Sequence, residues 1–315
     1  MKEKNQASVV TVTLNPAVDV TLYFSQFILG SVNRVQEERK DPGGKGINVA
    51  KVVRALGEGV AVTGFLGMKN KDVFEEYFAR HGIVNHFVEL PGETRANYKL
   101  VDREQGRVTE INYPGLQASQ ENMKALWDKL LQVADCQPII VFSGSLPPGM
   151  PETFYKEALR RIQPAGCKTY LDTSGTALAE GIKGIPYMVK PNLEELRQLT
   201  GRDLDVGQGL EEVADELLAS GIQEVVVSLG ERGSFVATRT KRILAQAPVV
   251  KVGSTVGAGD ALVAGLAVGE ARGLSLAERI RLATATAAAS VMRPGTQAAS
   301  SSEVEGLLSK VVLKA

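Results

Sequence analysis

Short apolar runs rich in β-branched residues recur along this chain and alternate with stretches of helical periodicity. The runs are Val9–Leu14, Val60–Leu66, Ile139–Phe142, Thr169–Leu171, Tyr187–Val189 and Val225–Leu229. Several are continuous rather than alternating, which is typical of strands buried on both faces of a parallel sheet. Between them, apolar residues recur at helical spacing in Asp72–Ala79 and Asn122–Val133. Strands that alternate with helices predict right-handed βαβ units and an α/β fold with helices on both faces of a central sheet.

Two stretches, Thr21–Arg39 and Phe87–Tyr113, depart from this alternation and have the character of short, partly exposed strands. Within the second, Asp102–Gly106 predicts a hairpin loop. No linker rich in Pro, Gly or Ser separates either stretch from the rest. We therefore expect one domain over residues 1–315, with a small β-sheet formed by excursions at about 21–39 and 87–113. Near the end of the chain, the serines before Glu303 predict a helix N-cap, with the last helix over Val304–Val312.

Composition excludes several classes of function. The 36 Lys and Arg residues balance 36 Asp and Glu residues, and 44% of the chain is hydrophobic. A neutral globular chain of this kind lacks the basic excess that a nucleic-acid or anionic-membrane surface needs. No apolar run approaches the ~20 residues of a membrane span, and no signal-peptide pattern occurs at the N-terminus. Two cysteines cannot form a disulfide framework. We expect a cytoplasmic protein without nucleic-acid or membrane partners.

A glycine-rich loop, Gly253–Asp260, leads into the alanine-rich apolar run Ala261–Ala267. This order predicts a loop that opens a buried helix. The first N–H groups of such a helix and its positive dipole end suit a phosphate, or the charge that develops during phosphoryl transfer. Asp260 falls in the first turn, where its carboxylate could also serve only as a helix cap.

A second glycine cluster, Asp41–Ala50, precedes the amphipathic stretch Ile47–Leu56 and would also serve as a tight strand-to-helix turn. The chain contains neither the G-x-x-x-x-G-K-[ST] pattern nor G-x-G-x-x-G, so a Walker A loop is absent and nicotinamide binding loses its main support. Three further turns follow predicted strands: Ser143–Gly149, Lys190–Glu195 and Gly230–Gly233. Because open α/β sheets bind ligands at the carboxyl ends of their strands, these turns predict one convergent cleft.

Taken in order, these segments resemble the ribokinase-like carbohydrate kinases of the PfkB family, and the likeness runs from Thr13–Asp19 to the helix after Asp260. Its most specific parts are Gly43–Ala50 and Val256–Asp260. The resemblance implies a three-layer α/β/α sandwich with a mostly parallel central sheet and a small β-sheet lid over the sugar. Lids of this family often pair between subunits, which implies a homodimer.

The resemblance also implies a set of site residues. Asp260 would be the general base, and the backbone N–H groups of Gly257, Ala258, Gly259 and Asp260 would form an anion hole. The ATP side would comprise Lys190, Asn192, Ser228, Gly230, Gly233, Thr255, Gly257 and Gly259. Glu195 would help to hold Mg²⁺ through water. The sugar side would comprise Asp19, Gly43, Gly44, Lys45, Asn48, Arg95, Lys99, Ser145 and Asp260. Among these, the cations of Arg95, Lys45 and Lys99 suit an acceptor that already carries a phosphate.

Within the family, Gly43–Gly46 and Thr94–Leu100 are most similar to the branch that includes 1-phosphofructokinases and tagatose-6-phosphate kinases. The reaction so implied is the ATP-dependent phosphorylation of D-fructose 1-phosphate to D-fructose 1,6-bisphosphate. Tagatose 6-phosphate is the closest alternative acceptor, followed by fructose 6-phosphate. A non-catalytic sugar-phosphate sensor would have lost Asp260 or the anion-hole glycines, and both are present.

Overall fold

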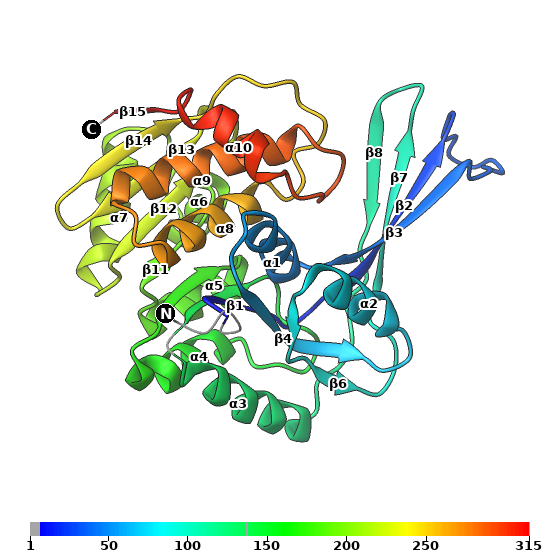
Figure 1. The fold of residues 1–315 in the computed structure, drawn as a ribbon, viewed down its shortest axis with the longest axis horizontal. Helices are drawn as coiled ribbons and strands as arrows, with labels where there is room; N and C mark the ends of the chain where they lie inside the picture. Colours follow the sequence, from blue (N-terminus) through cyan, green and yellow to red (C-terminus); the bar gives the residue numbers. More distant parts are fainter. Residues whose placement is uncertain (1–6, 137, 315) are drawn as a thin grey trace.

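The computed structural model describes residues 7–136 and 138–314, in which a central eleven-stranded sheet carries the fold (Figure 1). Its strands run in the order β15-β14-β13-β12-β11-β10-β9-β1-β4-β5, and β6 also pairs with β4. They are β1 (Val9–Thr13), β4 (Val60–Gly67), β5 (Val84–Asn85), β6 (Val88–Leu90), β9 (Ile139–Ser143), β10 (Lys168–Asp172), β11 (Met188–Val189), β12 (Glu224–Ser228), β13 (Ser234–Thr238), β14 (Arg242–Gln246) and β15 (Val312–Lys314). The pairings from β5 through β12 are parallel, and β13, β14 and β15 add antiparallel strands at one edge.

Helices cover both faces of this sheet. They are α1 (Lys45–Ala55), α2 (Asp72–His81), α3 (Gln120–Ala134), α4 (Phe154–Ile162), α5 (Gly175–Gly181), α6 (Leu193–Thr200), α7 (Gln208–Ala219), α8 (Ala258–Ala271), α9 (Leu276–Val291) and α10 (Ser301–Leu308), with 3₁₀ turns η1 (Gln163–Ala165), η2 (Ile182–Gly184) and η3 (Gly230–Arg232). One core cluster joins the sheet to α1, α2, α8, α9 and α10, and a second joins its other face to α3, α4, α5, α6 and α7. The predicted three-layer α/β/α fold is therefore confirmed.

The continuous apolar runs behave as strands buried on both sides. In β9, Ile139 and Val141 belong to one core cluster, whereas Ile140 and Phe142 belong to the other. Strand β1 lies between β4 and β9, so the chain builds the sheet outward from β1 in both directions. Crevices at the carboxyl ends of strands beside such a reversal point are where open α/β sheets bind ligands.

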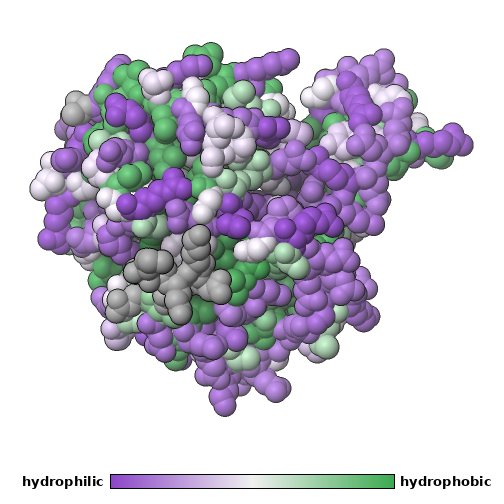
Figure 2. Space-filling model, viewed as in Figure 1, coloured by the Kyte–Doolittle hydropathy of each residue, from purple (hydrophilic) through white to green (hydrophobic). Residues whose placement is uncertain are grey.

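A separate four-stranded sheet, which we call the lid, has the order β3-β2-β7-β8 and projects from the body as a distinct lobe (Figures 1 and 2). Its strands are β2 (Ala17–Phe24), β3 (Glu37–Gly43), β7 (Ala96–Asp102) and β8 (Arg107–Ile111). Strands β2 and β3 extend beyond the predicted stretch 21–39 at both ends, because Ala17 is already buried and pairs with Gly43. Asp102 pairs with Arg107 and closes the predicted hairpin.

Two local predictions need correction. Strand β6, inside the predicted excursion 87–113, pairs with β4 of the central sheet instead of the lid, since its Leu90 is buried in the body. The predicted last helix over Val304–Val312 ends at Leu308, and Val312 pairs with Gln246 at the edge of the central sheet. The N-cap at Ser300 is present, as a capping box with Glu303. Among the residues that the structure describes, no helix combines the length and the apolar character needed to cross a bilayer.

Candidate active site

Asp260 occupies the first turn of α8, as the glycine-rich loop predicts. Gly257 is the N-cap with a φ of +82°, a left-handed conformation that favours glycine, and no side chain of the described residues caps this end of the helix. The Ala258 N–H donates to the Thr255 carbonyl at 3.4 Å, and among the described residues the N–H groups of Gly257, Gly259 and Asp260 have no acceptor, so these three are left for an anion. The Asp260 carboxylate is buried, and Asn48 Nδ2 of α1 donates a hydrogen bond of 2.9 Å to its Oδ2. This contact joins the two glycine-rich motifs that lie far apart in the sequence.

Burial and charge together set the ionisation of Asp260. Loss of solvent is the largest influence, and the negative charge of Asp172 acts in the same direction, so that the pKa of Asp260 rises to about 7. Lys45, the Asn48 hydrogen bond and Lys190 oppose this rise. A carboxylate whose pKa lies near neutrality is suited to general-base catalysis, because it can both accept and release a proton there.

Asp172 at the end of β10 gathers two cations beside this carboxylate. Lys190 Nζ lies 3.1 Å and Lys45 Nζ 3.8 Å from Asp172 Oδ1, while Ser143 Oγ donates to Oδ2 at 3.2 Å. Burial alone would raise the pKa of Asp172, but the two ammonium groups and the hydrogen bonds outweigh it and hold the pKa below its usual value. The Lys190 ammonium also lies next to the start of α8, since a Cβ added at Gly259 would be 3.5 Å from Nζ.

Asp19 of β2 forms a second group at the base of the lid. Its carboxylate is mostly buried, and Lys99 Nζ of β7 lies 3.7 Å from Oδ2. Gly43 packs so closely that an added Cβ would lie 2.6 Å from the Asp19 carboxyl carbon. Gly44 is the N-cap of α1 with a φ of +115°. Asn97 pairs with Asp19 in the β2–β7 register, and among the described residues its buried Oδ1 has no hydrogen-bond partner. This group thus combines a carboxylate, an ammonium and an amide oxygen that can exchange hydrogen bonds with hydroxyl groups.

Asn192 and Glu195 make a reciprocal capping box at the start of α6. Glu195 N–H donates to Asn192 Oδ1 at 2.7 Å, and Asn192 N–H donates to Glu195 Oε2 at 2.8 Å. The negative charge of Asp172 is the main cause of the raised pKa of Lys45, and the charges of Asp260 and Glu195 act in the same direction. In the described part of the chain, no three His, Cys, Asp or Glu side chains form a metal cluster.

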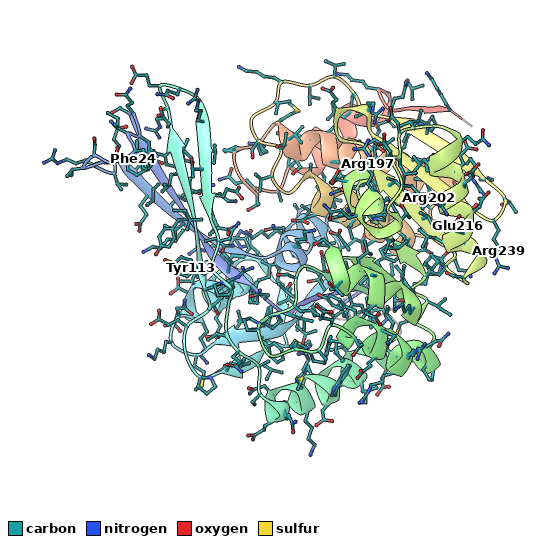
Figure 3. All side chains as sticks on the ribbon, turned by 180° about the vertical axis from the view of Figure 1, so that it is seen from behind. Phe24, Tyr113, Arg197, Arg202, Glu216 and Arg239 are labelled. Atoms are coloured by element: carbon teal, nitrogen blue, oxygen red, sulfur yellow. The ribbon has the colours of Figure 1, made fainter. Side chains whose placement is uncertain are left out.

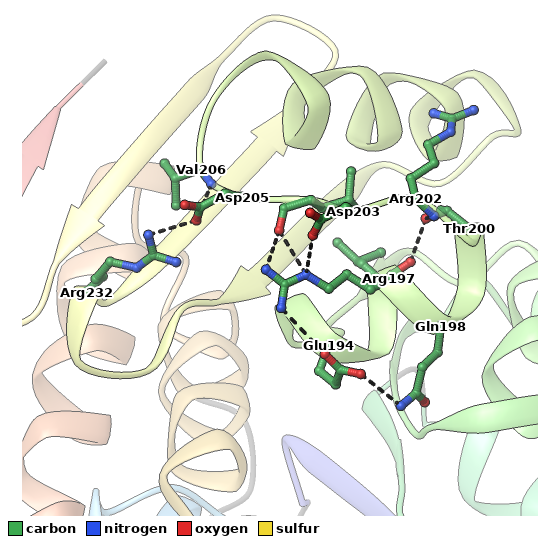
Figure 4. Close-up of polar contacts among 11 residues, drawn as sticks. Glu194, Arg197, Gln198, Thr200, Arg202, Asp203, Asp205, Val206 and Arg232 are labelled. Atoms are coloured by element: carbon green, nitrogen blue, oxygen red, sulfur yellow. Dashed lines mark hydrogen bonds and ion pairs between the residues drawn. The ribbon is translucent and has the colours of Figure 1, made fainter.

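The loop after β12 lies beside this capping box. Asn192 and Ser228 form a parallel β-bridge, and Gly230 has open space around its α-carbon. Arg232 reaches Asp205 at 2.9 Å, which ties this loop to the segment after α6 (Figure 4). In the same network Arg197 Nε donates to the Leu204 carbonyl at 2.9 Å. These contacts connect the loop after β12 to α6 and to the segment that follows it.

Arg95 is held by backbone carbonyls. Its Nε donates to Pro16 at 3.2 Å, Nη2 to Asn15 at 2.9 Å and Nη1 to Tyr113 at 2.5 Å. Tyr113 lies where the lid meets the body, whereas Phe24 lies well out along the lid (Figure 3). Arg95 and Ser145 line a common cavity of about 530 Å³, whose lining includes neither Asp19 nor Asp260. Arg95 thus clamps the lid base and presents its remaining N–H groups to a neighbouring hollow.

Comparison with known proteins identifies the family. The model of the pfkB family carbohydrate kinases matches residues 8–303. The chain belongs to this family. A 1-phosphofructokinase of Xanthomonas campestris pv. campestris is 42% identical over 262 residues, covering 82% of each chain. A 1-phosphofructokinase of Haemophilus influenzae is 39% identical over 97% of each chain.

Solved structures show the same fold for the kinase. Phosphofructokinase-2 from Escherichia coli in complex with potassium superposes with a TM-score of 0.91 at 29% identity, covering 96% of this chain and 98% of that one. Ribokinase from Thermotoga maritima has a TM-score of 0.80 at 23% identity, covering 96% and 99%. Membership of the family makes the chain a phosphotransferase with an alcohol acceptor, for which ATP is the phosphoryl donor.

Three groups of predicted residues emerge in the kinase. Asp260, Asn48, Lys45 and Lys190 form one connected group, Asp19, Gly43 and Lys99 a second, and Arg95 and Ser145 a third. Gly233 differs from the others, because an added Cβ would lie 1.9 Å from the Ala245 carbonyl oxygen of β14. Its lack of a side chain is required by strand packing. Thr255 is exposed in the loop before α8.

Sequence reasoning missed Asp172 and Asn97. Asp172 ends β10 as Ser143 ends β9, and the two residues are paired in the β9–β10 register. A carboxylate at the end of a buried strand was therefore a usable signal, because that position is at the ligand-binding edge of the sheet. Asn97 lies inside the predicted lid strand, where alternation alone does not show which side chains face the cleft.

Proposed function

We propose that this kinase transfers the γ-phosphoryl group of ATP to D-fructose 1-phosphate, giving D-fructose 1,6-bisphosphate and ADP. The observation that carries the proposal is the placement of Asp260: a buried carboxylate with a pKa near 7, at the uncapped start of α8 and held by Asn48. The choice of acceptor is supported by relatives named 1-phosphofructokinase that are 36–42% identical over 82–97% of the chain.

In the proposed reaction, Asp260 takes the proton of the acceptor hydroxyl as that oxygen attacks the γ-phosphorus. The bond from the γ-phosphorus to its bridging oxygen breaks, and the electron pair leaves with ADP. N–H groups of Gly257, Ala258, Gly259 and Asp260 stabilise the negative charge on the transferred group, with the Lys190 ammonium beside them. A positioned base typically contributes about 10²–10⁴-fold, and alignment of the two substrates supplies much of the rest.

Mg²⁺ fits the same site. One oxygen of Glu195 accepts a hydrogen bond from Asn192 N–H, which leaves the other for a water of the ion. When bound, the ion neutralises phosphate charge. Asn192, Ser228 and Gly230 surround the nucleotide phosphates, with Gly233 and Thr255 in the flanking loops.

On the sugar side, Asp19 accepts hydrogen bonds from hydroxyl groups, while Gly43 and Gly44 let the sugar approach the backbone. Lys99 and Lys45 carry the positive charge that the phosphate of the sugar substrate requires. Arg95 and Ser145 are the remaining residues of the sugar side. We infer that residues 1–315 act as one domain whose lid closes over the sugar. We also infer a homodimer formed through the lid.

The experiment that tests the function compares acceptors side by side. We expect kcat/KM for fructose 1-phosphate to exceed that for tagatose 6-phosphate and for fructose 6-phosphate, measured with ATP and Mg²⁺. Asp260→Asn should lose about 10²–10⁴-fold in kcat and keep its affinity for both substrates, because it preserves the shape of the site and removes the base. Wild-type turnover in this variant would refute the assignment of the base. A higher kcat/KM for another sugar phosphate would reassign the acceptor.

A further inference from the structure

A second cavity of about 670 Å³ lies between the C-terminal half of α1, helix α2, strand β3 and the segment 296–298. Lys51 and Arg54 line it from α1, Tyr77 and His81 from α2, and Asp41 from β3. Its lining includes none of the residues assigned above to the sugar or the nucleotide. The volume is within the range of small-molecule sites, about 300–1,000 Å³.

Lys51 is a buried cation that forms no ion pair with the residues that the structure describes. Its Nζ donates to the Pro42 carbonyl at 2.5 Å and lies 5.1 Å from the centre of the Tyr77 ring. No carboxylate of the described residues lies within 4.0 Å of its Nζ. Burial lowers the pKa of Lys51 to about 8, although the negative charges of Asp41 and Asp19 oppose this shift. Asp41, the acidic residue of the lining, is already paired with Arg39 at 2.7 Å. The two carboxylates whose charge acts on Lys51 are each engaged by another cation, Asp41 by Arg39 and Asp19 by Lys99. Because a buried ammonium is costly unless it is paired, this cavity favours an anion.

Arg54 supplies a second positive charge to the same cavity. Its Nε donates to the His81 carbonyl at 2.8 Å, and none of the described residues accepts a hydrogen bond from its two terminal nitrogens. The rings of Tyr77 and His81 stack at 4.0 Å and form a flat wall, which Ile83 extends with an apolar side chain. Arg39 balances the charge of Asp41 and Lys99 balances that of Asp19, so the positive charges of Lys51 and Arg54 are in excess and are available to a ligand.

We propose that this cavity binds a phosphate monoester. Its dianionic phosphate contacts Lys51 and Arg54, whose guanidinium fork matches phosphate oxygens, and the rest of the ligand lies against the wall of Tyr77 and His81. Two sources share this chemistry: a separate phosphorylated molecule, or the phosphate of the proposed sugar substrate reaching in from the cleft. Only the second source rests on the proposed function.

The cavity shares its walls with the active site. Lys51 follows Asn48 by one turn of α1, and Asp41 pairs with Asp19 in the β2–β3 register. A Cβ added at Gly257 would lie 3.4 Å from Thr296 Cγ2, on the segment that closes the cavity. A ligand here therefore borders the elements that carry the sugar side and the anion hole, which makes the KM for the sugar a useful second measurement.

The test is thermal unfolding with inorganic phosphate, compared with chloride at equal ionic strength. A ligand that binds only the folded state raises Tm with concentration. We expect phosphate to raise the Tm of the wild type, of Lys190→Met, which removes a cation of the cleft, and of the exposed control Lys124→Met on α3. Lys51→Met and Arg54→Met should each lose most of this rise. Arg54 lies on the exposed wall, so its variant keeps the test valid if burial makes Lys51→Met unstable.

The proposal is overturned if Arg54→Met and any folded Lys51→Met retain the full phosphate-dependent rise, or if Lys190→Met alone abolishes it. The KM for fructose 1-phosphate then separates the two sources. An unchanged KM in Lys51→Met and Arg54→Met indicates a separate phosphorylated ligand, whereas a rise of about tenfold or more indicates the phosphate of the substrate. The Tm measurement needs no turnover, so a failure of the proposed reaction would leave it unaffected.

Discussion

The protonation of Asp260 should control the rate near neutral pH. Burial and the charge of Asp172 raise its pKa to about 7, and the reaction needs the carboxylate form. We therefore expect kcat/KM to fall about tenfold per pH unit below pH ~7 and to level off above it. A pH profile with saturating ATP and Mg²⁺ measures this. A profile that stays level down to pH ~5 would mean that the base has an ordinary carboxylate pKa.

The negative charge of Asp172 should raise the pKa of Asp260 without direct contact between the two carboxylates. Replacing Asp172 by Asn removes a negative charge and leaves Lys190 and Lys45 to favour the Asp260 carboxylate, so the acid limb of the profile should move to lower pH. Ser143→Ala is the matched control, because it removes a hydrogen bond to Asp172 but keeps the charge. An unshifted limb in Asp172→Asn would show that its charge does not reach the base.

Asp260 should also cost stability, with a sign that pH reveals. Its folded pKa of about 7 lies above the unfolded value of ~3.9, so the folded state binds more protons between these limits. The stabilisation of the folded state by the bound proton is complete below pH ~4 and is lost as pH rises through about 7. Above that pH the folded state must hold a buried carboxylate, which lowers the free energy of unfolding. We expect Asp260→Asn to raise Tm by roughly several degrees at pH ~8 and by little at pH ~4. Calorimetry at both pH values checks this, and an equal gain at both would remove the electrostatic explanation.

At the scale of elements, close packing at the turn from β3 into α1 positions Asp19. An alanine Cβ at Gly43 would lie 2.6 Å from the Asp19 carboxyl carbon, so Gly43→Ala must move that carboxylate. We expect the KM for the sugar phosphate to rise about tenfold or more while the KM for ATP changes little. Gly306→Ala in α10 is the control, because its Cβ meets no atom within 4 Å and it should leave both KM values unchanged. Equal rises in both KM values for Gly43→Ala would contradict a local effect on the sugar.

The elements also show where sequence reasoning succeeds and where it stops. A continuous apolar run indicates a strand that is buried on both faces. The bounds of β4, β9 and β12 were therefore predictable to within two residues. The choice of a neighbouring strand depends on residues far away in the sequence. Val312 lies in a strand because it pairs with Gln246 at the edge of the central sheet, and β6 joins that sheet because Leu90 is buried in the core of the body.

The same limit holds for the candidate site. Glycine motifs predict that Asp260 starts a helix, because the signal lies within a few consecutive residues. The importance of Asp172 depends on Lys45 and Lys190, which come from α1 and from the end of β11 and meet only in the folded chain. The three carbonyl groups that hold Arg95 could not be predicted from the sequence either, because every residue has a backbone carbonyl and its position depends on the fold.

At the scale of the whole molecule, the lid has two unlike faces. The β2–β7–β8 register places Leu22, Leu100, Tyr98 and Ile111 on the face opposite Asp19 and Lys99, and Ile111 is 46% exposed. An apolar face on a projecting sheet favours pairing with a second copy, which would also protect its strand edges.

Ile111→Asp should therefore shift the proposed dimer toward monomer, because it places a charge on the apolar face that the proposed interface would bury. Val108→Asp is the matched control: it lies on the same strand, is 56% exposed and points to the other face. Sedimentation velocity over a range of protein concentrations measures the shift. If the lid closes over the sugar only when paired, Ile111→Asp should also raise the KM for the sugar phosphate more than that for ATP. A wild-type chain that sediments as a monomer, or equal dissociation in both variants, would remove the lid as the interface and leave its apolar face without this explanation.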